Sequence, residues 1–279
     1  MKILACDGIH ADGLTLFKEA GFDVEVSDPI KDIAVLAEKL KDFDGIMVRS
    51  ATLITAEALK KATHLKVIGR AGAGGDTIDV EAATARGIAV MNAPDGNTLA
   101  AAEHAVSLLF ALARHIPRAD AGMKAGEWPK NGLTGFELEG KRLGVIGLGR
   151  IGATVARKAV GIGMEVAAFD PFLPASASGR MSVPMKTLDE LLAWADIITL
   201  HIPRTKETTN IIGEAQMRAM RKGSYLINAA RGGLVDEEAL VKVLDEGHLA
   251  GAALDTFVTE PLQKDSPLRA NPKLILTPH

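Results

Sequence analysis

Short apolar runs alternate with segments of helical periodicity through the first third of the chain. The runs are rich in β-branched and aliphatic residues, whereas the segments between them repeat apolar residues at spacings of three and four. Such alternation predicts βαβ units and a parallel sheet. The predicted strands are Lys2–Cys6, Asp23–Val26, Gly45–Val48, Leu65–Ile68 and Ile88–Met91, and the predicted helices are Gly13–Ala20, Ile33–Leu40, Ala56–Ala62 and Val80–Arg86.

A turn-rich segment, Asn92–Asn97, ends this alternation and leads into a long apolar helix. The helix is predicted to run from about Thr98 to His115 and to stop near Pro117. It is apolar around most of its circumference, so we expect it to be buried on both sides, as a core helix or as one shared with a dimer interface. Asp12 and Thr55 are predicted to precede the first and third helices.

A second alternation follows a loop that contains Trp128. Six strands with helical crossovers are what a doubly wound nucleotide-binding domain requires. We therefore expect two α/β domains with doubly wound parallel sheets: a flavodoxin-like substrate-binding domain over residues 1–97 and a Rossmann NAD-binding domain over residues 98–279. The predicted strands of the second domain are Arg142–Ile146, Glu165–Phe169, Ile197–Leu200, Tyr225–Asn228, Gly251–Leu254 and Leu274–Leu276, with helices at Gly152–Val160, Leu188–Trp194, Ala215–Met220 and Glu237–Glu246.

Composition narrows the classes of partner. The 279 residues include 32 Lys and Arg against 35 Asp and Glu, a net charge of −3 that gives no general attraction for nucleic acid or anionic membranes. The apolar stretch Leu99–Ala113 is interrupted by Glu103 and His104 and is too short to span a bilayer. With Cys6 as its one cysteine, the chain has no disulfide framework. We expect a cytoplasmic protein with a small-molecule substrate.

One glycine motif stands in the right context for a dinucleotide site. Gly147, Gly149 and Gly152 follow a predicted strand and open a predicted helix, so they can form a tight turn, let a pyrophosphate approach, and pack helix on sheet. The helix N-terminus adds N–H donors for the phosphates. Asp170 ends the next strand, where a carboxylate can bind the ribose hydroxyls and repel a 2′-phosphate. The glycine motif and Asp170 together favour NAD over NADP.

Three polar residues follow the last three predicted strands. In an open α/β sheet, ligands bind beyond the carboxyl ends of the strands, so Arg231, Glu260 and His279 can converge there. A histidine can accept the proton of a secondary alcohol, and a carboxylate beside it can fix its tautomer. A guanidinium can hold a substrate carboxylate in a bidentate contact. No His, Cys, Asp and Glu residues have metal-ligand spacing, so we predict no metal.

With these residues in place, the chain resembles the D-2-hydroxyacid dehydrogenase family from end to end. The resemblance implies that Arg231 binds substrate and polarises its carbonyl, Glu260 orients the histidine, and His279 is the acid and base. It implies that the protein is a homodimer that uses NAD to oxidise 3-phospho-D-glycerate to 3-phosphohydroxypyruvate in serine biosynthesis. The segments that carry it are Val48–Thr52, Val67–Gly74, Met91–Pro94, Gly147–Gly152, His201–Pro203, Ala230–Gly233, Glu260–Pro261 and Pro278–His279.

The resemblance also implies individual binding residues. The small residues of the Arg70–Gly74 loop present N–H groups to a substrate carboxylate, and Arg49 and Arg70 are candidates for a substrate phosphate. The implied cofactor-binding residues are Gly147, Gly149, Arg150, Ile151, Gly152, Asp170, Ile202, Ala229, Ala230 and Asp255, and the implied substrate-binding residues are Arg49, Ser50, Arg70, Gly72, Ala73 and Gly74.

Two other functions remain open from the sequence. One is a D-2-hydroxyacid reductase of the glyoxylate/hydroxypyruvate type or of the D-lactate type. The other is an NAD-sensing binding protein like the corepressors of the same superfamily, because fold alone does not fix function. The complete set of Arg231, Glu260 and His279 favours an enzyme, since a sensor needs no acid or base.

The sequence departs from the family pattern at two places. Gly75 replaces a larger apolar residue and Thr77 replaces an asparagine, so we expect a more flexible loop and weaker substrate binding. The printed chain stops at His279, where family members continue with a Gly-Ala-rich loop and helices. For a shortened chain we expect a histidine that is held less firmly and a looser hinge near Asn97.

Overall fold

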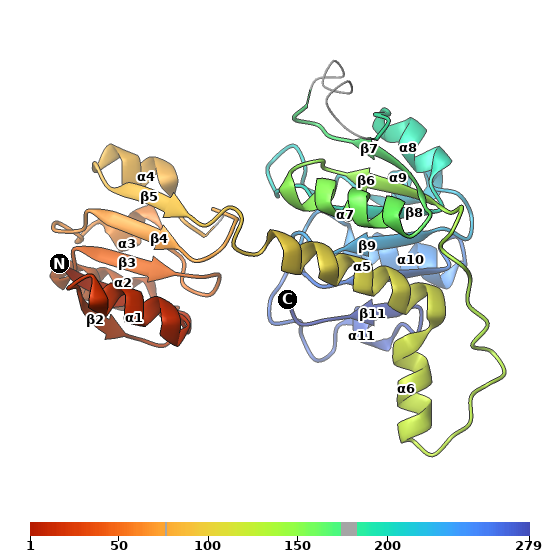
Figure 1. Cartoon of the computed structure of the whole chain (residues 1–279), viewed down its shortest axis with the longest axis horizontal. Coiled ribbons are helices and arrows are strands. Elements are labelled where there is room, and N and C mark those ends of the chain that lie inside the picture. The colour runs from red at the N-terminus through yellow and green to blue at the C-terminus, as the bar shows by residue number, and fades with distance from the viewer. Residues whose placement is uncertain (76, 174–182) are drawn as a thin grey trace. The chain divides into compact units, whose positions relative to one another are not determined.

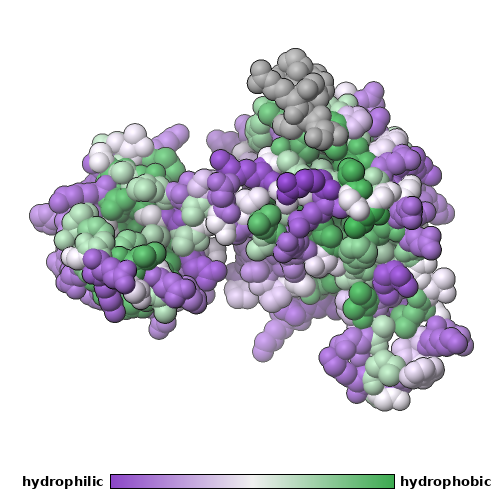
Figure 2. All heavy atoms as spheres, viewed as in Figure 1, coloured by the Kyte–Doolittle hydropathy of each residue, from purple (hydrophilic) through white to green (hydrophobic). Residues whose placement is uncertain are grey.

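The computed structural model describes residues 1–75, 77–173 and 183–279. The chain divides into two compact units, Met1–Thr98 and Leu99–His279, each with its own parallel sheet. Both units are drawn in Figure 1, and hydrophilic residues cover much of the face of each that is seen in Figure 2. The predicted architecture of two α/β domains with parallel sheets is confirmed.

The first unit has a five-stranded sheet in the order β2-β1-β3-β4-β5, which is the flavodoxin-like order. Its core lies between this sheet and helices α2, α3 and α4, and its fully buried side chains include Leu4, Ile46 and Ile68. The strands are β1 (Lys2–Ala5), β2 (Asp23–Val26), β3 (Gly45–Val48), β4 (Val67–Arg70) and β5 (Ala89–Asn92), and the helices are α1 (Ala11–Glu19), α2 (Ile33–Lys39), the 3₁₀ turn η1 (Leu40–Asp42), α3 (Ala56–Leu59) and α4 (Val80–Ala85).

Two details of the first unit differ from the prediction. Strand β4 lies two residues later than Leu65–Ile68, so it ends on Arg70 and places the following loop directly at the carboxyl edge of the sheet. Helix α1 begins earlier than predicted, because the side chain of His10, and not that of Asp12, caps it: His10 Nδ1 accepts from Asp12 N at 3.3 Å. Thr55 caps α3 as predicted, accepting from Ala58 N at 3.2 Å.

The second unit has a six-stranded sheet in the order β11-β10-β9-β8-β6-β7. Met185 adds an isolated parallel bridge to Ala168, outside β7, and completes the Rossmann order around β6. The order reverses between β6 and β8, which is where a doubly wound sheet opens its ligand crevice. The strands are β6 (Arg142–Ile146), β7 (Glu165–Phe169), β8 (Ile197–Leu200), β9 (Tyr225–Asn228), β10 (Gly251–Leu254) and β11 (Leu274–Leu276).

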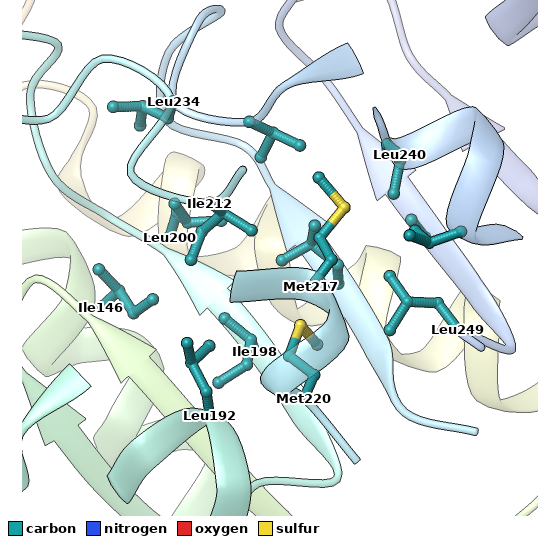
Figure 3. Packing of buried hydrophobic residues seen from close by; sticks show 14 of the residues in the cluster. Ile146, Leu192, Ile198, Leu200, Ile212, Met217, Met220, Leu234, Leu240 and Leu249 are labelled. Carbon is teal, nitrogen blue, oxygen red and sulfur yellow. The ribbon is translucent and has the colours of Figure 1, made fainter. Parts of the chain in front are cut away.

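Helices cover both faces of this second sheet. Successive strand residues point to opposite faces, so Ile198 and Leu200 pack with α8, α9 and α10, whereas Ile197 packs with α5 and α7. Figure 3 shows the first of these layers, where Met217 and Leu240 meet the sheet. The helices are α5 (Thr98–Arg114), α6 (Ile116–Lys124), α7 (Arg150–Gly161), α8 (Leu188–Trp194), α9 (Glu214–Ala219), α10 (Glu237–Asp245) and α11 (Pro267–Ala270).

Two helices, α6 and α11, are absent from the prediction, and proline is the reason. The sequence predicts that Pro117 ends a helix, but it lies in the first turn of α6, where its missing N–H costs nothing. His115, at φ 52°, separates α5 from α6, and the two helices are bent by 67°. The short helix α11 likewise has Pro267 in its first turn.

Helix α5 is buried on one face only within its own unit, so it is not a core helix of that unit, and its expected second contact in a dimer interface stays a prediction. The buried residues include Ala105, Leu109 and Leu112, whereas Leu99 and Phe110 are exposed. Within the described residues, no single helix has the length and apolar character to cross a membrane; only the bent pair α5 and α6 would meet that standard together.

Candidate active site

The glycine motif forms the turn between β6 and α7. Gly147 has φ 94°, and a Cβ there would lie 2.5 Å from Ile202 Cγ2 and 2.6 Å from the carbonyl oxygen of His201. A Cβ on Gly152 would lie 1.9 Å from the carbonyl oxygen of Gly147. Both positions therefore exclude any side chain. The turn packs against the segment that follows β8, and this segment forms the other side of the crevice between β6 and β8.

Gly149 has the opposite environment. A Cβ built on it meets no protein atom within 4 Å, and the residue is the N-cap of the twelve-residue helix α7. Arg150 and Ile151 follow in the first turn of this helix. The N–H groups at this end have no partner within the helix and carry a partial positive charge. Open space in front of such an end fits a pyrophosphate, so this chain can hold a dinucleotide as the sequence predicts.

Asp170 lies directly after β7, and its two oxygens have different roles. Oδ2 accepts from Leu148 N in the glycine turn at 2.8 Å, and Oδ1 accepts from Phe172 N at 2.8 Å. The carboxylate therefore caps its own turn and also ties the glycine turn to β7. Each oxygen keeps a second lone pair for a ribose hydroxyl, so the structural role and the proposed ribose contact are compatible.

The acid–base pair is in direct contact. His279 Nδ1 lies 2.7 Å from Glu260 Oε2, and the other oxygen of Glu260 accepts from Phe257 N at 3.0 Å. Both side chains are a little over one-third exposed. The contact leaves Nε2 of His279 as the nitrogen available to a ligand. This is the geometry that an orienting carboxylate and a histidine base require.

Arg231 follows β9, the strand next to β10. Its loop is fixed by Asn228, which is almost fully buried: Asn228 Nδ2 donates to Arg231 O at 2.8 Å and Asn228 Oδ1 accepts from Ala230 N at 3.1 Å. A Cβ on Gly232 would lie 1.8 Å from the carbonyl oxygen of Phe257, so this loop packs tightly on the loop that leads to Glu260. Arg231, Glu260 and His279 thus follow three neighbouring strands, β9, β10 and β11.

Two supporting residues were missed from the sequence. Asn228 is the single polar residue that closes the run Tyr-Leu-Ile-Asn, which was a usable signal. Glu237, in the first turn of α10, accepts from Val258 N at 2.7 Å, next to the peptide N–H that Glu260 binds. Burial raises the pKa of Glu237, and the charge of Glu260 adds to the effect. Nothing in its local sequence distinguishes Glu237 from an ordinary acidic residue in a first helical turn.

His201 is a poor candidate for the base. Desolvation lowers the pKa of its imidazole to about 4, so it stays neutral and is a weak base near pH 7. Its Nε2 lies 3.0 Å from Thr199 Oγ1. His201 therefore has a structural role, since it packs against the glycine turn at Gly147.

In the first unit, the loops after β3 and β4 carry the predicted substrate residues. Arg49 and Ser50 are exposed, whereas Arg70 is only 8% exposed. Arg70 Nε donates to Thr77 Oγ1 at 3.2 Å, and that hydroxyl donates to Arg49 O at 3.4 Å. Thr77, at the position where the family has asparagine, therefore still connects the two loops. Gly72, Ala73 and Gly74 complete the second loop, and Asn92 Nδ2 donates to Ala73 O at 2.8 Å.

Asp7 organises the first of these loops and was also missed. It lies just after β1 with φ 66°, and one oxygen accepts from the backbone N of Arg49, Ala51 and Thr52 at 2.8, 3.3 and 3.1 Å. Its other oxygen accepts from Thr52 Oγ1 at 2.5 Å. The buried carboxylate thus fixes the turn from which Arg49 projects. A polar residue directly after an apolar strand was the available signal.

The remaining predicted cofactor residues lie at the same carboxyl edge of the second sheet. Ile202 follows β8, Ala229 and Ala230 follow β9, and Asp255 follows β10. Among residues 1–75, 77–173 and 183–279, no group of three or more His, Cys, Asp or Glu side chains is placed to hold a metal ion.

Comparison with known proteins identifies the family of the chain. Residues 106–279 match the model of the D-isomer specific 2-hydroxyacid dehydrogenase family, NAD binding domain. The chain belongs to that family. It is 44% identical to D-3-phosphoglycerate dehydrogenase of Archaeoglobus fulgidus and 47% identical to that of Methanocaldococcus jannaschii, with all of this chain and 53% of each relative covered.

A solved structure has the same fold. The crystal structure of the TT0316 protein from Thermus thermophilus superposes on this chain with a TM-score of 0.92 at 37% identity, covering all of this chain and 89% of that one. The family and the Rossmann fold predicted from the sequence are confirmed, and so is NAD as the cofactor. The chain spans about half the length of the curated relatives it matches.

Proposed function

We propose that the protein uses NAD to oxidise 3-phospho-D-glycerate to 3-phosphohydroxypyruvate, a step of serine biosynthesis. The observation that carries the proposal is the 2.7 Å contact between His279 and Glu260, on loops next to the one that bears Arg231. The relatives named D-3-phosphoglycerate dehydrogenase support the choice of substrate. The proposed phosphorylated substrate also supports the expected cytoplasmic location, because such anions do not cross membranes unaided.

The proposed chemistry follows from this chain's own groups. NAD, when bound, supplies the acceptor for the hydrogen that leaves C2 of the substrate as hydride. With Nδ1 bonded to Glu260, His279 Nε2 takes the hydroxyl proton, and the carboxylate stabilises the imidazolium that forms. The Arg231 guanidinium holds the substrate carboxylate. In the reverse direction it polarises the carbonyl, whose oxygen receives the proton from His279.

Arg49 is proposed to bind the substrate phosphate, and Arg49→Ala tests the substrate class. We expect the kcat/KM for phosphohydroxypyruvate to fall about 10- to 100-fold, because a charge-assisted phosphate contact is lost. Hydroxypyruvate has no phosphate, so its kcat/KM should change far less. Arg49 is preferred to Arg70 for this test because Arg70 is buried and its loss would disturb the loop.

Arg86→Ala is the matched control for Arg49→Ala. Arg86 is an exposed arginine of the same unit, and it donates to Lys60 O at 3.2 Å beyond the C-terminus of α4, away from the two loops. We expect its kinetics to match the wild type. Equal losses on both substrates in Arg49→Ala would contradict a phosphate role for this residue.

We infer that the protein is a homodimer that uses α6 and the loop after it. Helix α6 has no buried residue and extends from the rest of its unit (Figure 1). Ile116 and Met123 are about half exposed, and Trp128 is 78% exposed. Exposed apolar residues gathered on one element favour a protein interface. They lie further along the chain than the Thr98–His115 segment proposed from the sequence, where one face of α5 packs in its own core.

Sedimentation velocity tests the dimer. We expect the wild type to sediment as a dimer and Met123→Glu to shift it to monomer, because a buried unpaired charge costs several kcal/mol, of order 3–5. Leu16→Glu is the control, since Leu16 is an exposed apolar residue of α1 in the other unit. A wild type that sediments as a monomer at all concentrations would contradict the proposal.

A further inference from the structure

His104, on α5, makes a contact that the mechanism above does not use. Its Nε2 lies 3.1 Å from Asp255 Oδ1 and 3.2 Å from Thr277 Oγ1, and the Thr277 hydroxyl donates to the same Asp255 oxygen at 2.5 Å. An ionised carboxylate only accepts, so His104 must carry its proton on Nε2 and donate. Three elements, α5, β10 and β11, thus meet at one carboxylate oxygen.

The position of Asp255 in the sheet indicates which part of the cofactor it meets. Asp170, proposed to bind the adenosine ribose, follows β7 at one edge of the sheet, and β6, β8 and β9 separate β7 from β10, which Asp255 follows. Asp255 therefore lies toward the nicotinamide end, on the side of Glu260 and His279. The nicotinamide ring system has one hydrogen-bond donor, the N–H₂ of its carboxamide, and a carboxylate is the complementary acceptor.

The two bonds at Oδ1 leave the other oxygen for this donor. Asp255 is 15% exposed, and its backbone N donates to Asn228 O at 2.9 Å, so the residue is held at both ends. Within residues 1–75, 77–173 and 183–279, no protein donor bonds to Oδ2. His104 and Thr277 together fix the carboxylate rotation, because both donate to Oδ1.

We infer that His104 is a positioning residue that orients Asp255 so that Oδ2 accepts from the nicotinamide carboxamide. The inference rests on the proposed placement of the nicotinamide at Asp255. His104 does not touch the cofactor; it acts through the carboxylate. Because Thr277 lies two residues before His279 and donates to the same oxygen, the contact also holds the end of β11 that carries the base.

Comparing the binding of NADH with that of an NADH analogue distinguishes this role from a merely structural one. Reduced 3-acetylpyridine adenine dinucleotide has an acetyl group in place of the carboxamide and so lacks the N–H₂ donor. We expect His104→Ala to weaken NADH binding, followed by fluorescence, about 5- to 10-fold, and to leave binding of the analogue almost unchanged. His104→Gln keeps a side-chain N–H and should recover part of the NADH affinity.

Controls make each failure distinguishable. Ser107→Ala, on the exposed face of α5 where the hydroxyl donates to Glu103 O, should bind both cofactors as the wild type does. Asp255→Ala should show the same preference for loss of NADH. If Asp255→Ala weakens both cofactors equally, the placement of the nicotinamide is wrong. If Asp255→Ala discriminates but His104→Ala weakens both equally or neither, the role of His104 is overturned. Neither result depends on turnover, so the proposed reaction is tested separately.

Discussion

Replacing His279 with alanine is expected to lower kcat for phosphohydroxypyruvate reduction about 10³-fold. The substitution removes the nitrogen that exchanges the substrate proton, and general acid–base catalysis contributes about 10² to 10⁴. NADH affinity should be retained. The glycine turn follows β6 and Asp170 follows β7, and β8, β9 and β10 separate both strands from β11. Stopped-flow absorbance for the chemical step and fluorescence titration for NADH binding measure the two quantities on the same preparation.

His64→Ala is the control for this prediction, since His64 is exposed in the other unit. It should leave kcat unchanged. The kcat of Glu260→Gln should lie between those of His279→Ala and His64→Ala, because the amide can still contact Nδ1 but cannot stabilise the imidazolium. A His279→Ala enzyme that retains most of its kcat would remove His279 from the chemistry and leave the reaction without a base among the residues proposed here.

Alanine at either of two glycines of one turn is expected to weaken NADH binding, but only one of the two substitutions should also lower stability. Gly152→Ala would place Cβ 1.9 Å from the carbonyl oxygen of Gly147, a backbone atom that cannot give way. We expect it to lower the free energy of unfolding by about 3 kcal/mol, as overpacked cores do, and to abolish measurable NADH binding. Gly149→Ala adds a methyl group in open space, so unfolding should be little changed.

The loss in Gly149→Ala should appear in binding alone. The methyl group lies where the pyrophosphate approaches the N-terminus of α7, so NADH affinity should fall about 10-fold or more, which is about 1.4 kcal/mol. Thermal unfolding with and without NADH measures both effects for both variants. Equal loss of stability in the two would contradict the crowding argument, and unchanged NADH affinity in Gly149→Ala would place the pyrophosphate elsewhere.

Much of the fold could be predicted because pattern and turn chemistry agree. Strands such as Arg142–Ile146 and Tyr225–Asn228 are apolar runs buried on both faces, and their bounds match the prediction. Errors arose where the same residue type is compatible with two different local structures. Pro117 ends a helix or begins one, and the difference depends on the left-handed backbone of His115, which composition does not reveal. The sequence of α5 likewise does not show which of its apolar faces packs against the sheet and which stays exposed.

The positions of candidate site residues were predictable where a polar residue follows a strand end, as with Asp170, Glu260 and His279. They were less so where a residue acts through another. Asp7, Asn228 and Glu237 hold loops by accepting from backbone N–H groups, and His104 reaches Asp255 across 151 residues of sequence. Such partners are decided by tertiary packing, and no local spacing in the sequence encodes them.

The most direct test of the proposed function is the rate of NADH oxidation with phosphohydroxypyruvate, hydroxypyruvate, glyoxylate and pyruvate, each added in turn to the wild-type protein. The account predicts that phosphohydroxypyruvate is the preferred substrate, with kcat/KM at least about 10-fold above the others, as one phosphate contact provides. Equal or faster turnover of an unphosphorylated acid would contradict the substrate assignment. NADH binding without turnover of any of the four would contradict the enzymatic function and favour a sensor.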